Sequence, residues 1–99
     1  MITTKQRAYL RGLANKYDTI LQIGKGGIMG NIIKSVDEAL EAREIIKIRC
    51  LENSFLPSRA AAQELSQVCN AEIVQVIGSI IVLYRRAKKD SKIVLPTVK

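Results

Sequence analysis

The spacing of apolar and polar residues predicts seven helices and strands along the 99-residue chain. The first is a helix that begins at Thr3 or Thr4, whose side-chain oxygen can cap the first turn, and runs to about Lys16. At 100° per residue, five apolar side chains fall on one arc of this helix. They are Tyr9, Leu10, Leu13, Ala14 and Tyr17. We expect this arc, with both tyrosines, to lie in the core.

A strand, a second helix and a second strand are expected next. Residues 19–23 are typical of a short strand, and a helix follows from about residues 29–31 to about Arg43. The outer face of this helix is expected to be acidic, with Asp37, Glu38, Glu41 and Glu44. Residues 45–51 alternate with a period of two, which predicts a strand that carries Lys47 and Arg49 on its more polar side.

The last third of the chain predicts a helix and a hairpin. Pro57 ends a loop and suits the opening of a helix over about residues 59–69. The residues expected to be buried in this helix are Ala61, Leu65, Val68 and Cys69. Asn70 follows where a left-handed cap is often needed. Two β-rich runs, 72–77 and 80–86, flank Gly78 and Ser79, and this spacing predicts a tight hairpin.

The predicted order of elements is therefore α-β-α-β-α-β-β. Strand–helix–strand steps favour right-handed crossovers between parallel strands, and the closing hairpin adds an antiparallel pair. We expect an α/β fold of the two-layer α+β type, with helices packed on a four-stranded mixed sheet. A chain of this length has room for one domain. Its core is expected at about residues 3–86, with a basic tail over residues 87–99.

Composition excludes several kinds of site. The chain has no histidine, which excludes Ser-His-Asp triads, Cys-His nucleophile pairs and histidine-ligated zinc or haem. Its two cysteines, Cys50 and Cys69, match no metal-binding motif and are expected to be buried thiols in a reducing cytosol. We therefore expect no catalytic residue, metal or cofactor. With no signal segment or membrane-spanning run in the sequence, we expect a cytoplasmic protein, and a monomer.

Positive charge is concentrated in two parts of the chain. The net charge is +7 at pH 7, and it divides into +5 over residues 1–36, −3 over 37–44, zero over 45–72 and +5 over 73–99. Such a separation predicts a surface that attracts a polyanion and another that does not. The acidic block is expected to be a solvated helix face rather than a metal site.

A glycine-rich loop, Gly24-Lys25-Gly26-Gly27, joins the first predicted strand to the second helix. Its backbone N–H groups, the positive end of the helix dipole and Lys25 can together hold a phosphate. The spacing matches neither the P-loop GxxxxGK[ST] nor the dinucleotide-binding GxGxxG. Gly24 and Gly27 do have the GxxG spacing with which KH domains clamp a nucleic-acid backbone. A simple tight turn is the alternative interpretation.

Several segments of the chain resemble the CRM domain, and in particular its stand-alone bacterial form, the YhbY-like RNA-binding proteins. These segments are residues 5–14 (KQRAYLRGLA), 22–27 (QIGKGG), 36–44 (VDEALEARE), 74–78 (VQVIG) and 83–85 (LYR). The resemblance covers residues 3–86 in the same order. The sequence departs from the family pattern at Asn15, where these proteins often have His, and at Asn70, where they often have Gly.

The resemblance implies a fold similar to that of the C-terminal domain of translation initiation factor 3. It also implies RNA binding through the GxxG loop and the adjacent basic surface. The expected partner is ribosomal RNA or the precursor of the large ribosomal subunit, whose assembly the protein would assist. Intron splicing, or the binding of another structured RNA, is the alternative that the family suggests.

The candidate RNA-binding residues are the glycine loop and the basic residues near both ends of the chain. They are Gly24, Lys25, Gly26, Gly27, Lys5, Arg7, Arg11, Arg85, Arg86, Lys88 and Lys89. Lys47 and Arg49 rank lower, because their stems can lie over apolar neighbours. Two other functions are weighed against RNA binding. One is a nucleotide enzyme that uses the glycine loop, which the missing Ser or Thr and the missing histidine disfavour. The other is a protein-interaction module that docks a partner on the acidic helix.

Overall fold

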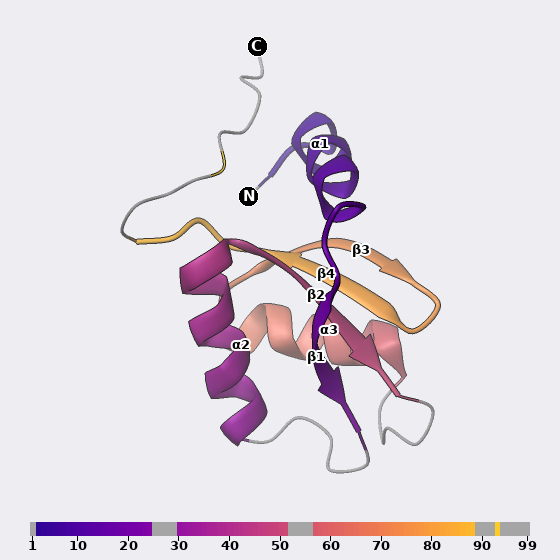
Figure 1. The fold of residues 1–99 in the computed structure, drawn as a ribbon, viewed down its shortest axis with the longest axis vertical. Helices are drawn as coiled ribbons and strands as arrows, with labels where there is room; N and C mark the ends of the chain where they lie inside the picture. Colours follow the sequence, from indigo (N-terminus) through magenta and orange to yellow (C-terminus); the bar gives the residue numbers. More distant parts are fainter. Residues whose placement is uncertain (1, 25–29, 52–56, 89–92, 94–99) are drawn as a thin grey trace.

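The structure is a computed structural model that describes residues 2–24, 30–51, 57–88 and 93. Helix α1 spans Thr4–Ala14, strand β1 Thr19–Ile23, helix α2 Gly30–Arg43 and strand β2 Ile45–Cys50. Helix α3 (Ser58–Val68) and strands β3 (Glu72–Ile77) and β4 (Ile80–Tyr84) complete the chain order (Figure 1). The predicted order of elements and the predicted α/β class are confirmed.

The four strands form one mixed sheet in the order β1-β2-β4-β3. Strand β1 pairs in parallel with β2, as a strand–helix–strand crossover requires. Strand β4 is antiparallel to both of its neighbours, β2 and β3. The second strand of the hairpin therefore lies between β2 and the first strand of the hairpin, and pairs with β2 from Ile45 opposite Tyr84 to Arg49 opposite Ile80.

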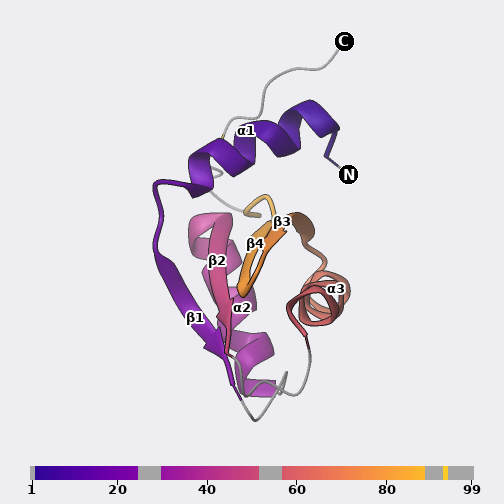
Figure 2. The same ribbon diagram turned by 90° about the vertical axis from the view of Figure 1, so that its right-hand side faces the viewer.

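Helices α2 and α3 cover one face of the sheet, and α1 lies across one end of the other face (Figure 2). The larger core cluster joins α2 and α3 to residues such as Ile46, Ile48 and Ile81 of the sheet. A smaller cluster lies under α1 and consists of Leu10, Ala14, Ile45, Val74, Val82 and Tyr84. Because α1 covers only one end, Gln22 and Arg49 stay exposed on the rest of this face.

Helix α1 begins with a capping box, as the threonines near its start predict. The Thr3 hydroxyl accepts the Gln6 N–H at 3.1 Å, and the Gln6 side chain accepts the Thr3 N–H at 3.0 Å. The prediction that both tyrosines of the helical arc are core is wrong. Leu10 and Ala14 are buried, whereas Tyr9 and Tyr17 are each 44% exposed, because the helix turns Leu10 and Ala14 toward the sheet and ends before Tyr17. Tyr84, in contrast, is buried.

Helix α3 starts at Ser58, directly after Pro57, and packs the face that contains Ala61, Ala62 and Leu65. Val68, expected in the core, is 52% exposed, because this face is rotated toward Ala62 and Cys69 and leaves Val68 at its edge. Asn70 has the predicted left-handed conformation, with φ of 55°. The hairpin turn also forms as predicted, with a φ of 55° at Gly78, where glycine has no steric penalty.

Candidate nucleic-acid interface

Gly24 lies directly after β1, at the end of the molecule where α2 begins (Figure 1). The Leu51 N–H donates to the Ile23 carbonyl oxygen at 2.9 Å, and this bond holds the carboxyl ends of β1 and β2 side by side. In open α/β sheets, ligands bind outside the carboxyl ends of parallel strands, close to the start of the following helix. The described end of the glycine loop therefore has the location of a phosphate site, while Lys25, Gly26 and Gly27 lie outside the described residues.

Packing does not explain why residue 24 is glycine. A Cβ atom added to Gly24 would lie 3.6 Å from the Leu51 Cδ1 atom, which is an ordinary van der Waals contact. Gly24 also lacks the positive φ that favours glycine at Gly78. The described neighbours of Gly24 leave room for an alanine side chain. Neither packing nor backbone conformation therefore requires glycine here, and a role in binding can explain it instead.

The basic residues of α1 lie at the opposite end of the molecule from Gly24 (Figures 1 and 2). Lys5 and Arg11 are exposed, whereas the Arg7 Nε donates to the carbonyl oxygen of Ile73 at 3.1 Å and ties α1 to β3. The exposed basic residues of α1 therefore do not lie next to the described start of the glycine loop, and their contact with RNA stays a prediction. The helix crosses the end of the sheet where β2 starts, and Gly24 lies at the end where β2 finishes.

Lys47 and Arg49 lie between these two ends, on the face of β2 that α1 only partly covers. Their neighbours in the strand, Ile46, Ile48 and Cys50, point into the core beneath α2 and α3. In the parallel pair with β1, Lys47 lies opposite Thr19 and Arg49 opposite Gln22. Lys47 and Arg49, which ranked lower as RNA-binding candidates in the sequence analysis, therefore lie on the surface between α1 and the start of the glycine loop. The period-two alternation of residues 45–51 was the signal for this placement.

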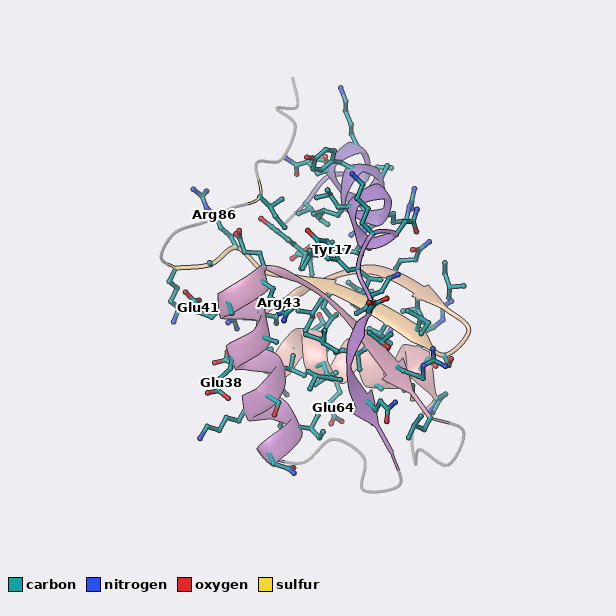
Figure 3. All side chains as sticks on the ribbon, viewed as in Figure 1. Tyr17, Glu38, Glu41, Arg43, Glu64 and Arg86 are labelled. Carbon is teal, nitrogen blue, oxygen red and sulfur yellow. The ribbon has the colours of Figure 1, made fainter. Side chains whose placement is uncertain are left out.

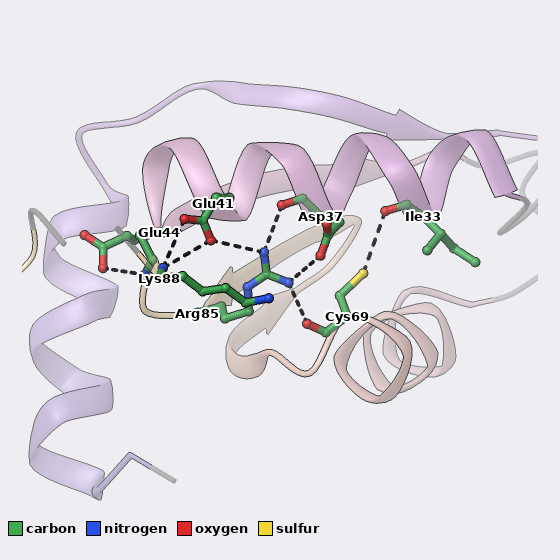
Figure 4. Close-up of polar contacts among 8 residues, drawn as sticks. Ile33, Asp37, Glu41, Glu44, Cys69, Arg85 and Lys88 are labelled. Atoms are coloured by element: carbon green, nitrogen blue, oxygen red, sulfur yellow. Dashed lines mark hydrogen bonds and ion pairs between the residues drawn. The ribbon is translucent and has the colours of Figure 1, made fainter. Parts of the chain in front are cut away.

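The Arg85 side chain forms hydrogen bonds within the protein (Figure 4). Its Nη1 donates to Asp37 Oδ1 at 2.6 Å and to the Cys69 carbonyl oxygen at 2.9 Å, and its Nη2 donates to the Asp37 carbonyl oxygen at 3.0 Å. The side chain is only 15% exposed. Its guanidinium thus joins β4 to α2 and to the end of α3. We therefore leave Arg85 out of the interface, although the sequence suggested it.

The acidic face of α2 binds the chain that follows β4, instead of being only a solvated surface. Glu41 accepts the Lys88 N–H with both carboxylate oxygens, at 3.2 and 3.0 Å. Glu44 is 1% exposed, and its carboxylate accepts the N–H groups of Ala87 at 3.0 Å and Ile93 at 2.9 Å. The expectation that Glu44 lies on the outer face is wrong, because its left-handed backbone (φ 67°) ends α2 and turns the residue inward.

This arrangement leaves two basic side chains exposed after β4. Arg86 and Lys88 are exposed, while the backbone around them is held by Glu41 and Glu44; Lys89 lies outside the described residues. Strand β4 ends at Tyr84, two residues earlier than expected, although the Arg85 N–H still donates to the Glu44 carbonyl oxygen in register with the pairing of β4 and β2.

Burial and nearby charges shift two pKa values in this region. Burial, with a smaller contribution from Glu44, raises the pKa of the Tyr84 phenol, and Arg86 opposes the shift. Burial also raises the pKa of the Cys69 thiol, and Asp37 adds to the effect while Arg85 opposes it. Cys50 and Cys69 are buried thiols that form no disulfide, as expected, and the raised pKa makes the Cys69 thiol a poor nucleophile.

A family comparison decides the class of the protein. The CRS1 / YhbY (CRM) domain matches residues 2–85. The chain belongs to this family. This membership confirms the resemblance seen in the sequence, and it supports a non-catalytic binding domain over a nucleotide enzyme.

Proteins similar to this CRM domain come from several bacteria. The Bacillus subtilis protein YqeI, named a probable RNA-binding protein, is 43% identical over 97% of this chain and 100% of its own length. A Haemophilus influenzae protein named an RNA-binding protein is 30% identical over 96% of this chain and 95% of its own. The solution structure of SAV1595 from Staphylococcus aureus, described as a candidate RNA-binding protein, superposes with a TM-score of 0.82. It is 51% identical and covers 97% of this chain and 100% of its own.

The described part of the CRM domain contains neither a metal-binding cluster nor a membrane-spanning helix. No group of three or more Cys, Asp or Glu side chains there is placed to hold a metal ion. None of the helices there has the length and the apolar character needed to cross a membrane.

Proposed function

We propose that this protein binds structured RNA, and that it does so through the sugar–phosphate backbone along the face of the sheet that α1 partly covers. The interface runs from the exposed Lys5 and Arg11 of α1, past Lys47 and Arg49 of β2, to the glycine loop that starts at Gly24. Arg86 and Lys88 extend it beyond β4. The RNA-binding names of the relatives support this class of ligand.

The observation that carries the proposal is the placement of Lys47 and Arg49. Both belong to a strand whose other side is fully in the core, so the sheet holds their backbone rigidly on the open face. Cations on a rigid surface at the spacing of alternate strand residues suit a backbone polyanion, since phosphate contacts position a protein on RNA without reading its sequence.

The acidic residues do not oppose this function. Asp37 is paired with Arg85, and Glu44 is buried against backbone N–H groups. Both lie on α2 or directly after it, and α2 packs against the opposite face of the sheet from Arg49. The negative charge of residues 37–44 therefore lies away from Lys47 and Arg49 and is partly neutralised, while Glu41 and Glu44 contact the backbone beside Arg86 and Lys88 at the edge of the interface.

We propose further that the RNA is ribosomal RNA, met in precursors of the large ribosomal subunit, and that the protein assists their assembly. This step rests on the resemblance to YhbY-like proteins. Crosslinking in cells, followed by sequencing of the attached RNA, tests it directly. Large-subunit precursor reads are expected, whereas a majority of intron or messenger reads would favour splicing or another structured RNA.

Binding in vitro has its own test, a salt titration with a structured fragment of large-subunit ribosomal RNA. Each phosphate that the protein neutralises should contribute about −0.7 to −0.9 to the slope of log affinity against log salt concentration. If Lys5, Arg11, Lys47 and Arg49 each neutralise one phosphate, the slope should be about −3. An affinity that does not depend on salt would contradict a backbone interface, and no binding at low salt would favour the protein-interaction alternative.

A further inference from the structure

A pocket of about 360 Å³ opens where α1, β1, α2 and β2 meet. Its walls include Tyr9, Leu13 and Tyr17 on one side and Arg43 and Lys47 on the other. Figure 3 shows Tyr17 just after α1 and Arg43 at the end of α2, both far from the end of β1 where the glycine loop starts. This volume is at the small end of the range for ligand pockets, about 300–1,000 Å³.

The aromatic wall of the pocket can contact a ligand because its two tyrosine rings are not buried in the core. Tyr9, Leu13 and Tyr17 follow one another at intervals of four residues and so form one stripe along α1 and the turn after it. Leu10 and Ala14 supply the buried contacts of the same helix, which leaves Tyr9 and Tyr17 each 44% exposed. The Tyr17 N–H donates to the Ala14 carbonyl oxygen at 3.0 Å, and this bond holds the backbone of Tyr17 close to the end of the helix.

The polar residues of the pocket suit one class of ligand. Arg43 and Lys47 are cations that can bind phosphate, and Asp18 adds a carboxylate that can accept hydrogen bonds from ring or exocyclic N–H groups. Aromatic rings with nearby cations and a hydrogen-bond acceptor are what proteins use to hold an unstacked base of single-stranded RNA.

We propose that this pocket binds an unpaired nucleobase of the RNA, with the base against Tyr9 and Tyr17 and its flanking phosphates on Arg43 and Lys47. The inference rests on the proposed function and deepens it, because Lys47 belongs both to the pocket and to the backbone interface. RNA that passes Lys47 and Arg49 therefore reaches the pocket without leaving the protein surface. The pocket at the α1 end of the sheet would bind an unpaired loop base, and the surface toward the glycine loop would bind the backbone of helical RNA.

The chain after β4 completes the pocket. Ile93 is one of its lining residues, and the Ile93 N–H is held by the buried carboxylate of Glu44 at 2.9 Å. The contact between Glu44 and the C-terminal segment thus also positions one wall of the base site.

The test compares two RNA probes, a hairpin with an unpaired loop and a fully paired duplex of the same length. The wild-type protein is expected to bind the hairpin more tightly. Tyr17→Leu keeps an apolar side chain but removes the ring, and should weaken hairpin binding by about 5- to 100-fold while duplex binding stays unchanged. Tyr17→Phe keeps the ring and should retain the preference. A fluorescent adenine analogue in the loop should be quenched by the wild-type protein, which tests stacking even if Tyr17→Leu fails to fold.

The possible outcomes separate the two proposals. If neither probe binds, RNA binding itself fails, and the base pocket fails with it. If both probes bind equally well, or if Tyr17→Leu weakens both equally, backbone binding survives and the base pocket is overturned. Self-association of the free protein that Tyr17→Leu abolishes would also overturn it, because a second copy of the chain would then occupy the pocket.

Discussion

The Nη1 atom of Arg85 lies 2.6 Å from Oδ1 of Asp37 and 2.9 Å from the carbonyl oxygen of Cys69, and so joins β4, α2 and the end of α3. The next residue, Arg86, is exposed. Two adjacent arginines that look equivalent in the sequence therefore have different environments. The side chain of Arg85 stabilises the fold, whereas the side chain of Arg86 is exposed to solvent.

Arg85→Lys should lower the free energy of unfolding by about 1–3 kcal/mol, because one ammonium cannot replace the forked guanidinium contacts. Most of this loss should come from the Cys69 carbonyl, since Asp37 is 58% exposed and water screens the ion pair. Arg86→Lys is the matched control and should change stability by less than about 0.5 kcal/mol. Urea unfolding of both variants measures the difference, and equal stabilities would contradict the assignment of Arg85.

Glu44→Gln should destabilise the protein by about 1–3 kcal/mol, because an amide can accept through only one of its two end groups. The N–H groups of Ala87 and Ile93 would then compete for a single oxygen. Hydrogen exchange at these two amides should become faster. The exposed Glu38 of α2 provides the control, and Glu38→Gln should leave both amides protected. Unchanged exchange in Glu44→Gln would contradict the anchoring of the C-terminal segment.

Tyr84 gives a pH dependence with a definite sign. Its pKa is raised in the folded protein, mainly by burial, so above a pH of about 10 the unfolded chain loses a phenolic proton that the folded protein keeps. The stabilisation is fully present below the unfolded pKa and is lost as the pH rises through the folded pKa. Tyr84→Phe should make this decline smaller, as measured by urea unfolding across alkaline pH, and the raised pKa of the Cys69 thiol should account for a remaining decline of the same sign. A decline of the same size in Tyr84→Phe as in the wild-type protein would exclude Tyr84 as a source of it.

Gly24→Ala should separate binding from folding. The added methyl group meets only an ordinary contact with Leu51, so thermal unfolding should change little. RNA affinity should fall if the backbone at this position approaches a phosphate closely. Gly12→Ala is a control in the exposed part of α1 and should raise the free energy of unfolding by about 0.5–1 kcal/mol, since alanine favours the helix. Full RNA affinity in Gly24→Ala would remove residue 24 from the proposed site.

Local patterns predicted most of the fold. The alternation of residues 45–51 predicted both β2 and its two faces, and the positions of Gly78 and Asn70 predicted a turn and a helix cap that both formed. These features depend on neighbours within a few residues. The same alternation also placed Lys47 and Arg49 together, although their importance depended on where α1 crosses the sheet.

Long-range contacts account for the features that the sequence did not predict. Glu44 looked like a fourth acidic residue on a solvated helix face, but its partners Ala87 and Ile93 lie 43 and 49 residues later. Arg85 was predicted to bind RNA, but its partners Asp37 and Cys69 lie 48 and 16 residues earlier. No local pattern shows which charges will be used by distant backbone groups, so the separation of folding charges from binding charges required the structure.

The central claim is that RNA contacts the open face of the sheet, and a pair of arginines tests it most directly. Arg49 is exposed on that face, and Arg59 is exposed on α3, which covers the other face. Affinity for the ribosomal RNA fragment should be measured for Arg49→Glu and Arg59→Glu across a range of salt. We expect Arg49→Glu to weaken binding by about 10- to 100-fold and to reduce the salt slope by about one, with little effect from Arg59→Glu. Equal losses in the two variants, or a loss only in Arg59→Glu, would contradict the proposed interface.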